Sequence, residues 1–125
     1  MSGDIYFGFD KSNPEKWEKN DGYVNSPTFA AFGELLDEAL GQSHPSQLEA
    51  IKEGQYQMMY NFCQLSPADY NAVIHALRNY LNGLRAPTEA QKNGIWVWQE
   101  MAEPFIRKDE RYDFAFHGET RPPEI

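Results

Sequence analysis

Apolar side chains recur every three or four residues in four stretches of the chain, which is the spacing of an amphipathic α-helix. The clearest stretch places them at Tyr70, Val73, Ile74, Leu77, Leu81 and Leu84. Ser66 and Pro67 come directly before it, and a serine followed by a proline is a frequent helix start. This pattern predicts a helix over about 67–84.

The other three stretches predict helices over about 27–40, 46–64 and 89–103. Each follows a side chain that can cap a helix start: Ser26, Ser46 or Thr88. Gly54 falls inside the second range, where glycine costs about 1 kcal/mol relative to alanine, and we interpret it as a site of close helix packing or a slight bend. Pro104 is predicted to begin a short fifth helix that runs through Arg111.

These patterns predict an all-α fold, a compact bundle of four to five amphipathic helices with an irregular aromatic N-terminal arm over 1–25. Turn-forming residues dominate the arm, and either a short extended segment at 4–9 or a brief helix at 15–19 fits it. A tail over 118–125 is predicted to be flexible. Because 125 residues is the usual size of one domain, a single helical domain is expected over 1–125.

The chain carries 19 acidic and 11 basic side chains, which gives a formal net charge of −8. This sign opposes the attraction to phosphate that dominates nucleic-acid affinity, so direct DNA or RNA binding is disfavoured. The acidic excess lies mainly in residues 1–60, where 10 Asp and Glu stand against 4 Lys. Without a secretory signal or an apolar run near the roughly 20 residues of a membrane span, a cytoplasmic protein is expected.

No motif for catalysis, nucleotide binding or metal binding is present in the sequence. Cys63 is the sole cysteine and lies at the end of an apolar stripe, which favours a buried structural thiol. The three histidines are far apart in sequence, and the acidic groups around Glu34 and around Asp109 are interpreted as exposed helix faces. We therefore predict no catalytic residues, no cofactor and no metal.

The acidic face of the first predicted helix is the feature most typical of a partner surface. Glu34, Asp37 and Glu38 are like-charge neighbours with no basic residue in the same helix. The leading hypothesis is an acidic inhibitor that binds a basic protein, most concretely an immunity protein that neutralises a cationic bacterial toxin such as a nuclease. Asp21 and Tyr23 form a weaker flank of this predicted site.

Two other hypotheses stand beside it, and the oligomeric state is left open. One is a helical interaction module that binds a peptide or helix in an apolar groove between the third and fourth helices, with Trp96 in the contact. The other is an enzyme with a dispersed site built from residues such as His75, Tyr70, Arg78 and Glu100.

Overall fold

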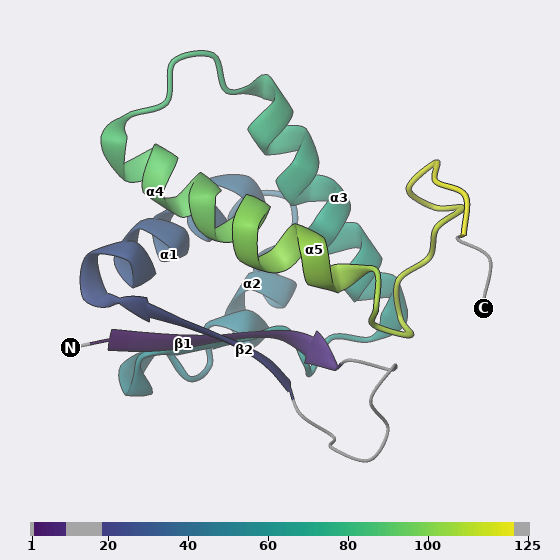
Figure 1. Ribbon diagram of the computed structural model, residues 1–125, viewed down its shortest axis with the longest axis horizontal. Helices are drawn as coiled ribbons and strands as arrows, with labels where there is room; N and C mark the ends of the chain where they lie inside the picture. The colour runs from purple at the N-terminus through teal and green to yellow at the C-terminus, as the bar shows by residue number, and fades with distance from the viewer. Residues whose placement is uncertain (1, 10–18, 122–125) are drawn as a thin grey trace.

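The computed structural model describes residues 2–9 and 19–121, without the side chains of residues 19–22. It shows a mixed α/β fold in which helices pack against a small sheet (Figure 1). The predicted all-α helical bundle is therefore wrong. Most helices begin where the sequence places them, and the errors fall in the first 25 residues, in the segment between residue 51 and α3, and after Ile106.

The sheet contains β1 (Ser2–Phe9), β2 (Lys19–Asn25) and β3 (Met59–Asn61) in the order β2-β1-β3. β1 pairs antiparallel with β2 and parallel with β3. Ile5 and Phe7 are buried against the helices, while Asp4 before them and Tyr6 between them are half-buried, as the two-residue period of a strand requires. The predicted irregular arm is thus largely a strand pair, and the predicted brief helix at 15–19 falls mostly outside the described residues.

The predicted helix over 46–64 is three separate elements. α2 (Pro45–Ile51) ends early, and a 3₁₀ turn η1 (Gln55–Gln57) leads into β3. Met58 adopts a left-handed backbone conformation with φ 56°, which a continuing helix does not allow. Gly54 accepts a hydrogen bond from the N–H of Met59 at 3.2 Å, so it marks the fold-back of the chain rather than a bend in a helix.

α1 (Ser26–Leu40) and α3 (Pro67–Gly83) confirm the helices predicted over 27–40 and 67–84. Ser66 caps α3 as expected, by accepting a hydrogen bond from the N–H of Asp69 at 3.2 Å. The cap of α1 is Asn25 rather than Ser26, and its Oδ1 accepts from the N–H of Thr28 at 2.9 Å. The first N–H groups of a helix have no hydrogen-bond partner within it. Both helices therefore begin at a polar side chain that accepts a hydrogen bond from one of these groups.

α4 (Glu89–Val97), a π-helical stretch η2 (Trp98–Ala102) and α5 (Glu103–Ile106) form one rod in place of the helix predicted over 89–103. The N–H of Glu103 donates to the carbonyl of Trp98, five residues back, which is the π spacing. Pro104 follows with no N–H to donate, so the helix widens just before it. The fifth helix predicted through Arg111 ends at Ile106.

Aromatic side chains fill the space between the sheet and the helices. The ring centroid of Phe7 lies 5.6 Å from that of Phe62, 6.0 Å from Phe32 and 6.4 Å from Trp98. In Figure 1, α1, α3, α4 and α5 lie on the same side of the sheet, so this core joins residues from all parts of the chain. No helix of the described ranges is long and apolar enough to cross a bilayer.

The C-terminal segment (residues 107–121) is held on β1 by a hydrogen bond to the carboxylate of a buried ion pair. Asp109 is 1% exposed and accepts a hydrogen bond from the N–H of Phe9 at 2.9 Å. Arg111 donates to the same carboxylate through its main-chain N–H and two guanidinium nitrogens, at 2.8 to 3.0 Å. Gly8 has φ +152°, and a Cβ there would overlap the Asp109 carboxylate. The prediction that Asp109 lies on an exposed helix face is therefore wrong.

Candidate functional site

The three acidic residues predicted to bind a partner lie on the exposed face of α1. The structure gives two of them partners from other elements. The Asp37 carboxylate lies 2.6 Å from Nζ of Lys52, which follows α2, and Glu38 accepts a hydrogen bond from the hydroxyl of Tyr80. The repulsion among Glu34, Asp37 and Glu38 is therefore partly relieved by tertiary contacts. These contacts involve residues outside the helix, so they cannot be seen in its sequence.

The acidic residues of α1 contribute to the pKa shifts of two neighbouring tyrosines. Burial, together with the charges of Asp37 and Glu34, raises the pKa of Tyr60 to about 12. Burial and the hydrogen bond to Glu38 likewise raise the pKa of Tyr80 to about 12. Burial is the largest cause of both shifts, and the negative charges of α1 add to it.

The two flanking residues of the predicted site come from β2. The backbone of Asp21 pairs with Tyr6, and its side chain lies outside the described part of the chain. Tyr23 is 70% exposed, pairs with Asp4, and accepts a hydrogen bond from the hydroxyl of Ser2. Tyr23 is thus an aromatic side chain held at the surface by the sheet.

Tyr23 borders a hollow that also contains Trp96, the residue at the centre of the alternative hypothesis. The hollow has a volume of about 450 Å³ and is lined by Tyr23, Val24, Asn25, Thr28, Asn93 and Trp96. We call it the aromatic hollow. Its walls come from β2, the start of α1 and α4, and Trp96 remains 51% exposed beside it. Two exposed aromatic side chains that the sequence places 73 residues apart therefore meet at one surface site.

The close approach of α4 to α1 builds this hollow. Gly94 faces α1 so closely that a Cβ there would lie 2.9 Å from the carbonyl oxygen of Ala31 and 3.4 Å from the Cβ of Leu35. A larger residue would push the two helices apart. The glycine therefore allows Asn93 and Trp96 to reach the start of α1.

The floor of the aromatic hollow is polar and fixed by hydrogen bonds. The hydroxyl of Thr28 donates to Oδ1 of Asn93 at 3.1 Å, and Oδ1 of Asn25 is held by the α1 cap. Two amide side chains are thereby positioned beside two aromatic rings. Such a combination suits a ligand with a flat or apolar body and polar groups at its edge.

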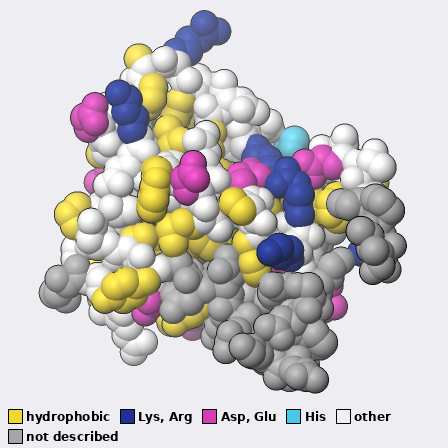
Figure 2. All heavy atoms as spheres, in the orientation of Figure 1, with side chains coloured by type: hydrophobic (Ala, Val, Ile, Leu, Met, Phe, Trp, Pro, Cys, Tyr) yellow, Lys and Arg dark blue, Asp and Glu magenta, His cyan; other side chains and the backbone are white. Residues whose placement is uncertain are grey.

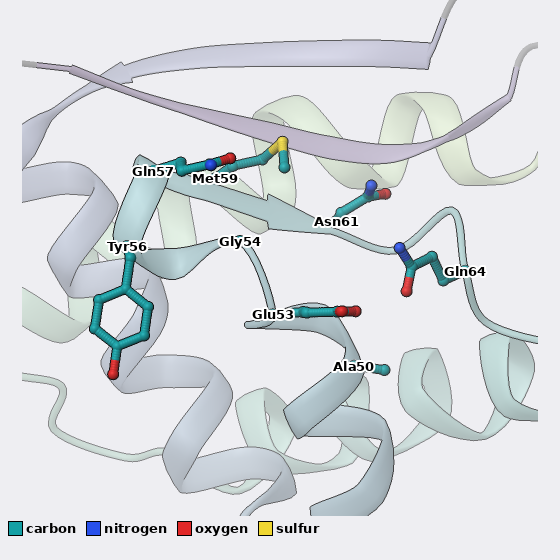
Figure 3. Close-up of a pocket in the computed structure, with 8 residues that line it drawn as sticks. All are labelled: Ala50, Glu53, Gly54, Tyr56, Gln57, Met59, Asn61 and Gln64. Carbon is teal, nitrogen blue, oxygen red and sulfur yellow. The ribbon is translucent and has the colours of Figure 1, made fainter.

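A second hollow of about 380 Å³ lies between β3 and the end of α2 (Figure 3). It is lined by Ala50, Glu53, Gly54, Tyr56, Gln57, Met59, Asn61 and Gln64. We call it the β3 hollow. Figure 3 shows Met59 and Gln57 along its β3 side and Glu53 across from them, whereas Tyr56 points away from it.

A third hollow of about 430 Å³ is dominated by charged side chains of α3, α5 and the C-terminal segment. Glu103 receives hydrogen bonds from Arg78 at 2.8 and 2.9 Å and from Nε1 of Trp98 at 3.0 Å. Arg107 joins Glu103 at 3.3 Å to Glu119 at 2.6 Å. Figure 2 shows basic and acidic side chains mixed over this region, with a histidine beside them.

The charges in this third hollow balance one another. Burial alone would raise the pKa of Glu103, but hydrogen bonds from Arg78 and Trp98 and the charges of Arg78 and Arg107 lower it. The hydrogen bond from Arg107 likewise lowers the pKa of Glu119. The two arginines and two glutamates form ion pairs with one another here. The network therefore holds the C-terminal segment against α3 and α5 and leaves none of these four charges unpaired.

The four residues named for a dispersed enzyme site are not brought together. Tyr70 is buried under the guanidinium of Arg111, 3.9 Å from its ring centroid, and Arg78 is bound to Glu103. His75 and Glu100 are exposed. Of the three hollows described above, only the third touches any of the four, through Arg78.

No family model matches this sequence, and neither does any curated protein or solved structure. Within residues 2–9 and 19–121, no group of three or more His, Cys, Asp and Glu side chains could hold a metal ion. The candidate site therefore depends on geometry alone, and the aromatic hollow is the surface feature that most resembles the centre of a binding interface.

Sequence reasoning named Tyr23 and Trp96 but assigned them to different hypotheses. A hollow does lie between α3 and the helix predicted over 89–103, but it is the charged third hollow, and Trp96 instead lines the aromatic hollow between β2, α1 and α4. The amides of Asn25 and Asn93 were missed, although Asn25 stands directly before a helix start, where an asparagine is a frequent cap. Glu119, within the tail predicted to be flexible, bonds to Arg107, and residues 122–125 lie outside the description.

Proposed function

We propose that this chain is a protein-binding inhibitor of a basic partner, most concretely a cytoplasmic immunity protein that neutralises a cationic toxin such as a nuclease. The observation that carries the proposal is the convergence of Tyr23 and Trp96 on one hollow of a strongly acidic chain. The aromatic hollow is the centre of the proposed interface, and the acidic face of α1 is its flank.

The hollow suits an arginine or lysine side chain of the partner. A guanidinium stacks on tryptophan and tyrosine rings, and such contacts contribute about 0.5–2 kcal/mol depending on how far they are desolvated. Amide side chains such as those of Asn25 and Asn93 can accept hydrogen bonds at the edge of a cation. Aromatic anchors of this kind carry most of the binding energy in many protein interfaces.

The acidic residues of α1 give speed and orientation to this encounter. Along a helix that rises 1.5 Å per residue, Glu34 lies about 9 Å and Glu38 about 15 Å from Thr28 at the hollow. Both distances exceed the Debye length of about 8 Å at physiological salt but lie within the roughly 30 Å at 0.01 M, so these charges act on the hollow mainly at low salt. They would attract a basic surface before the aromatic contact forms, and salt would weaken that attraction.

A second candidate function is a module that binds an apolar peptide or helix, and the half-exposed Trp96 favours it. Such a partner would fill the same hollow by apolar contact. Its affinity would hardly change with salt, whereas the affinity of a basic partner would fall as salt rises. The two candidates are therefore separated by one titration.

The experiment is affinity capture from a lysate of the source organism at low salt, followed by titration of the purified captured protein. Trp96→Ala and Tyr23→Ala should each raise the Kd by at least about 30-fold, the effect of a 2 kcal/mol anchor residue. Tyr56→Ala is the matched control, because Tyr56 is 101% exposed and lies outside the aromatic hollow. Reversing Glu34, Asp37 and Glu38 together should weaken binding and flatten its salt dependence.

Circular dichroism must show each variant folded before the affinities are compared. A basic partner whose Kd responds to Trp96→Ala and Tyr23→Ala but not to Tyr56→Ala supports the proposal. Failure to capture a basic protein, or a captured one whose Kd ignores both hollow variants, overturns it. A neutral partner that is lost only in Trp96→Ala and ignores salt supports the second candidate instead.

A further inference from the structure

β2 forms one edge of the sheet, and the outward side of its main chain meets no other described strand. The N–H of Asp4 donates to the carbonyl of Met58 at 2.9 Å, so the main-chain groups of Asp4 face β3 and not β2. Asp4 stands opposite Tyr23 in the antiparallel pair of β1 and β2, and the two form a pair without hydrogen bonds. The N–H and carbonyl of Tyr23 therefore point outward, away from β1.

The outward edge of β2 is long enough for a strand to add. β2 runs over Lys19–Asn25, and alternate residues of a strand repeat the same orientation. The N–H of Phe62 donates to the carbonyl of Tyr6 at 2.8 Å, so Tyr6 faces β3 and Asp21, its partner in β2, also presents its main-chain groups outward. Within residues 2–9 and 19–121, no hydrogen bond from outside the strand pair reaches the main chain of Tyr23. Two residues thus present four main-chain groups along this edge.

The aromatic hollow lies beside this edge, on the helix side of the sheet. Val24 lines the hollow and is buried, whereas Tyr23 next to it is 70% exposed, so these two side chains lie on opposite faces of β2. Figure 1 shows β2 running directly into α1, with α4 beside α1. A residue of an added strand that stands opposite Val24 would therefore direct its side chain into the hollow, toward Trp96. The residues before and after it would lie on the face of Tyr23.

The lining of the hollow and the charge of the chain select a basic occupant. The described lining contains two aromatic rings and two amides but no lysine or arginine that would repel a cation. A guanidinium that enters the hollow can stack on Trp96 and donate to the amide oxygen of Asn93. The net charge of −8 attracts a basic segment, whereas a second copy of the chain would bring a further −8, so charge opposes pairing between two β2 strands.

We propose that an extended segment of the basic partner adds to the outward edge of β2 as a further strand and places an arginine in the aromatic hollow. Main-chain hydrogen bonds to Asp21 and Tyr23 hold the segment, and the guanidinium reaches Trp96 from the position opposite Val24. Main-chain bonds of this kind give affinity, and the alternate side chains give specificity. The inference rests on the proposed function, because it assigns how the partner of that function binds the aromatic hollow.

The test uses the full chain, labelled with ¹⁵N, and a blocked hexapeptide of alternating valine and arginine as the probe. Hydrogen exchange at individual amides is measured by NMR with and without the peptide. At a free peptide concentration ten times the Kd, exchange at the Tyr23 amide should slow about tenfold, because the amide is open only in the unbound fraction. The amide of Val24 already faces β1, so its exchange should slow less than that of Tyr23.

Two N-methylated peptides separate strand addition from attraction by side chains alone. One carries methyl groups on the amides of its three valines and the other on the amides of its three arginines, so the two peptides have equal charge. In a strand these two sets of N–H groups point to opposite sides, and only one set can face β2. One peptide should therefore lose at least about tenfold in affinity and the other less than about threefold. The peptide that loses affinity shows whether the added strand runs antiparallel or parallel to β2.

A second pair of comparisons tests the arginine in the hollow. A peptide with citrulline, the uncharged analogue of arginine, should bind at least about tenfold more weakly, since the cation is lost while the shape is kept. Trp96→Ala should raise the Kd of the arginine peptide about threefold or more. Tyr56→Ala is the matched control and should change that Kd less than about twofold, because Tyr56 is fully exposed and lies outside the aromatic hollow.

Four results would overturn the inference. Binding without slower exchange at the Tyr23 amide, or equal affinity of the two N-methylated peptides, would show that the hollow holds a cation by its side chain alone, and the proposed function would stand. No binding up to about 1 mM peptide is the third result. The fourth is protection of the Tyr23 amide that grows with protein concentration in the absence of peptide, since a second copy would then occupy the edge. The proposed function itself is judged by capture of the partner, which does not depend on the peptide.

Discussion

Replacing Asp109 by asparagine tests how strongly the buried ion pair ties the two ends of the chain together. Asparagine has the same shape, so the change removes charge without leaving a cavity. One of its two terminal atoms becomes an NH₂ group, which then faces a donor: either the N–H of Phe9 or a nitrogen of Arg111. The guanidinium of Arg111 also keeps its positive charge at a site where its side chain is 10% exposed.

The expected loss of unfolding free energy follows from the Arg111 charge that is left without its counter-charge. Removing one partner of a buried ion pair costs about 3–5 kcal/mol, because the other charge is left buried without its counter-charge. With a urea m-value of about 1.5 kcal/mol per M, Asp109→Asn should lower the unfolding midpoint by about 2–3 M. The same reasoning predicts acid sensitivity: hydrogen bonds from Arg111 and Phe9 lower the pKa of Asp109 against the effect of burial, so its stabilisation is lost as the pH falls below about 4.

The assay is equilibrium urea unfolding followed by tryptophan fluorescence at neutral pH. Glu110→Gln serves as the control, since it removes one negative charge at the exposed neighbouring position and should shift stability by less than about 0.5 kcal/mol. A loss below about 1 kcal/mol in Asp109→Asn, or a loss equal to that of Glu110→Gln, would refute the reasoning. The carboxylate would then not be needed to hold the C-terminal segment on β1.

Two further predictions concern the same end of the molecule. Gly8→Ala places a side chain at φ +152° against the Asp109 carboxylate. The substitution should lower the free energy of unfolding by about 1–3 kcal/mol, measured by thermal or urea unfolding. An unchanged midpoint would contradict that geometry. Burial and the charge of Arg78 lower the pKa of His117. As the pH decreases below about 6.5, the unfolded chain therefore takes up a proton before the folded one does, and the free energy of unfolding decreases. His117→Gln should remove that part of the slope as the pH falls below about 6.5, and an unchanged slope would assign it to another group.

The helices that the sequence predicted well are those whose signals are local. α3 has a serine cap, a proline in its first turn and a regular apolar stripe, and each of these acts within a few residues. α1 is equally regular, and only its capping residue differs from the prediction. Local sequence signals are sufficient for these two helices, because packing of one helix face against the core favours the same structure that the signals predict.

β2 and β3 were missed, and β1 was predicted only as one of two alternatives, a short extended segment at 4–9, because the strand patterns are short or ambiguous. In β1, Ile5, Tyr6 and Phe7 are consecutive apolar residues, so the alternation of buried and half-buried positions is hidden in the sequence. In the segment after α2, Tyr60 and Phe62 fit a strand period, yet Met58 and Met59 also fit a helical stripe. The choice is made by pairing with β1, more than 50 residues earlier, and no local window contains that information.

The candidate site was predicted in its parts but not as a whole. Tyr23 and Trp96 were both named from the sequence, Trp96 because it widens the apolar surface of its helix beyond one face. Tyr23 and Trp96 lie beside the same hollow because α4 approaches α1 closely at Gly94 and Ala31. This is a tertiary contact that the local sequence does not predict. The acidic face of α1 was predicted as exposed and is so, but the pairing of Asp37 with Lys52 requires the position of α2 and could not be foreseen.

The hydrogen bond between Phe9 and Asp109 spans 100 residues of chain, and this has a consequence for synthesis in the cell. At about 5–20 residues per second, roughly 5–20 s separate the appearance of these two residues at the ribosome. Throughout that interval β1, the central strand of the sheet, lacks the carboxylate that holds its end. A nascent chain that stalls before residue 109 therefore presents an incomplete fold to the quality-control machinery, and the arrival of Asp109 decides whether the end of β1 is kept in place.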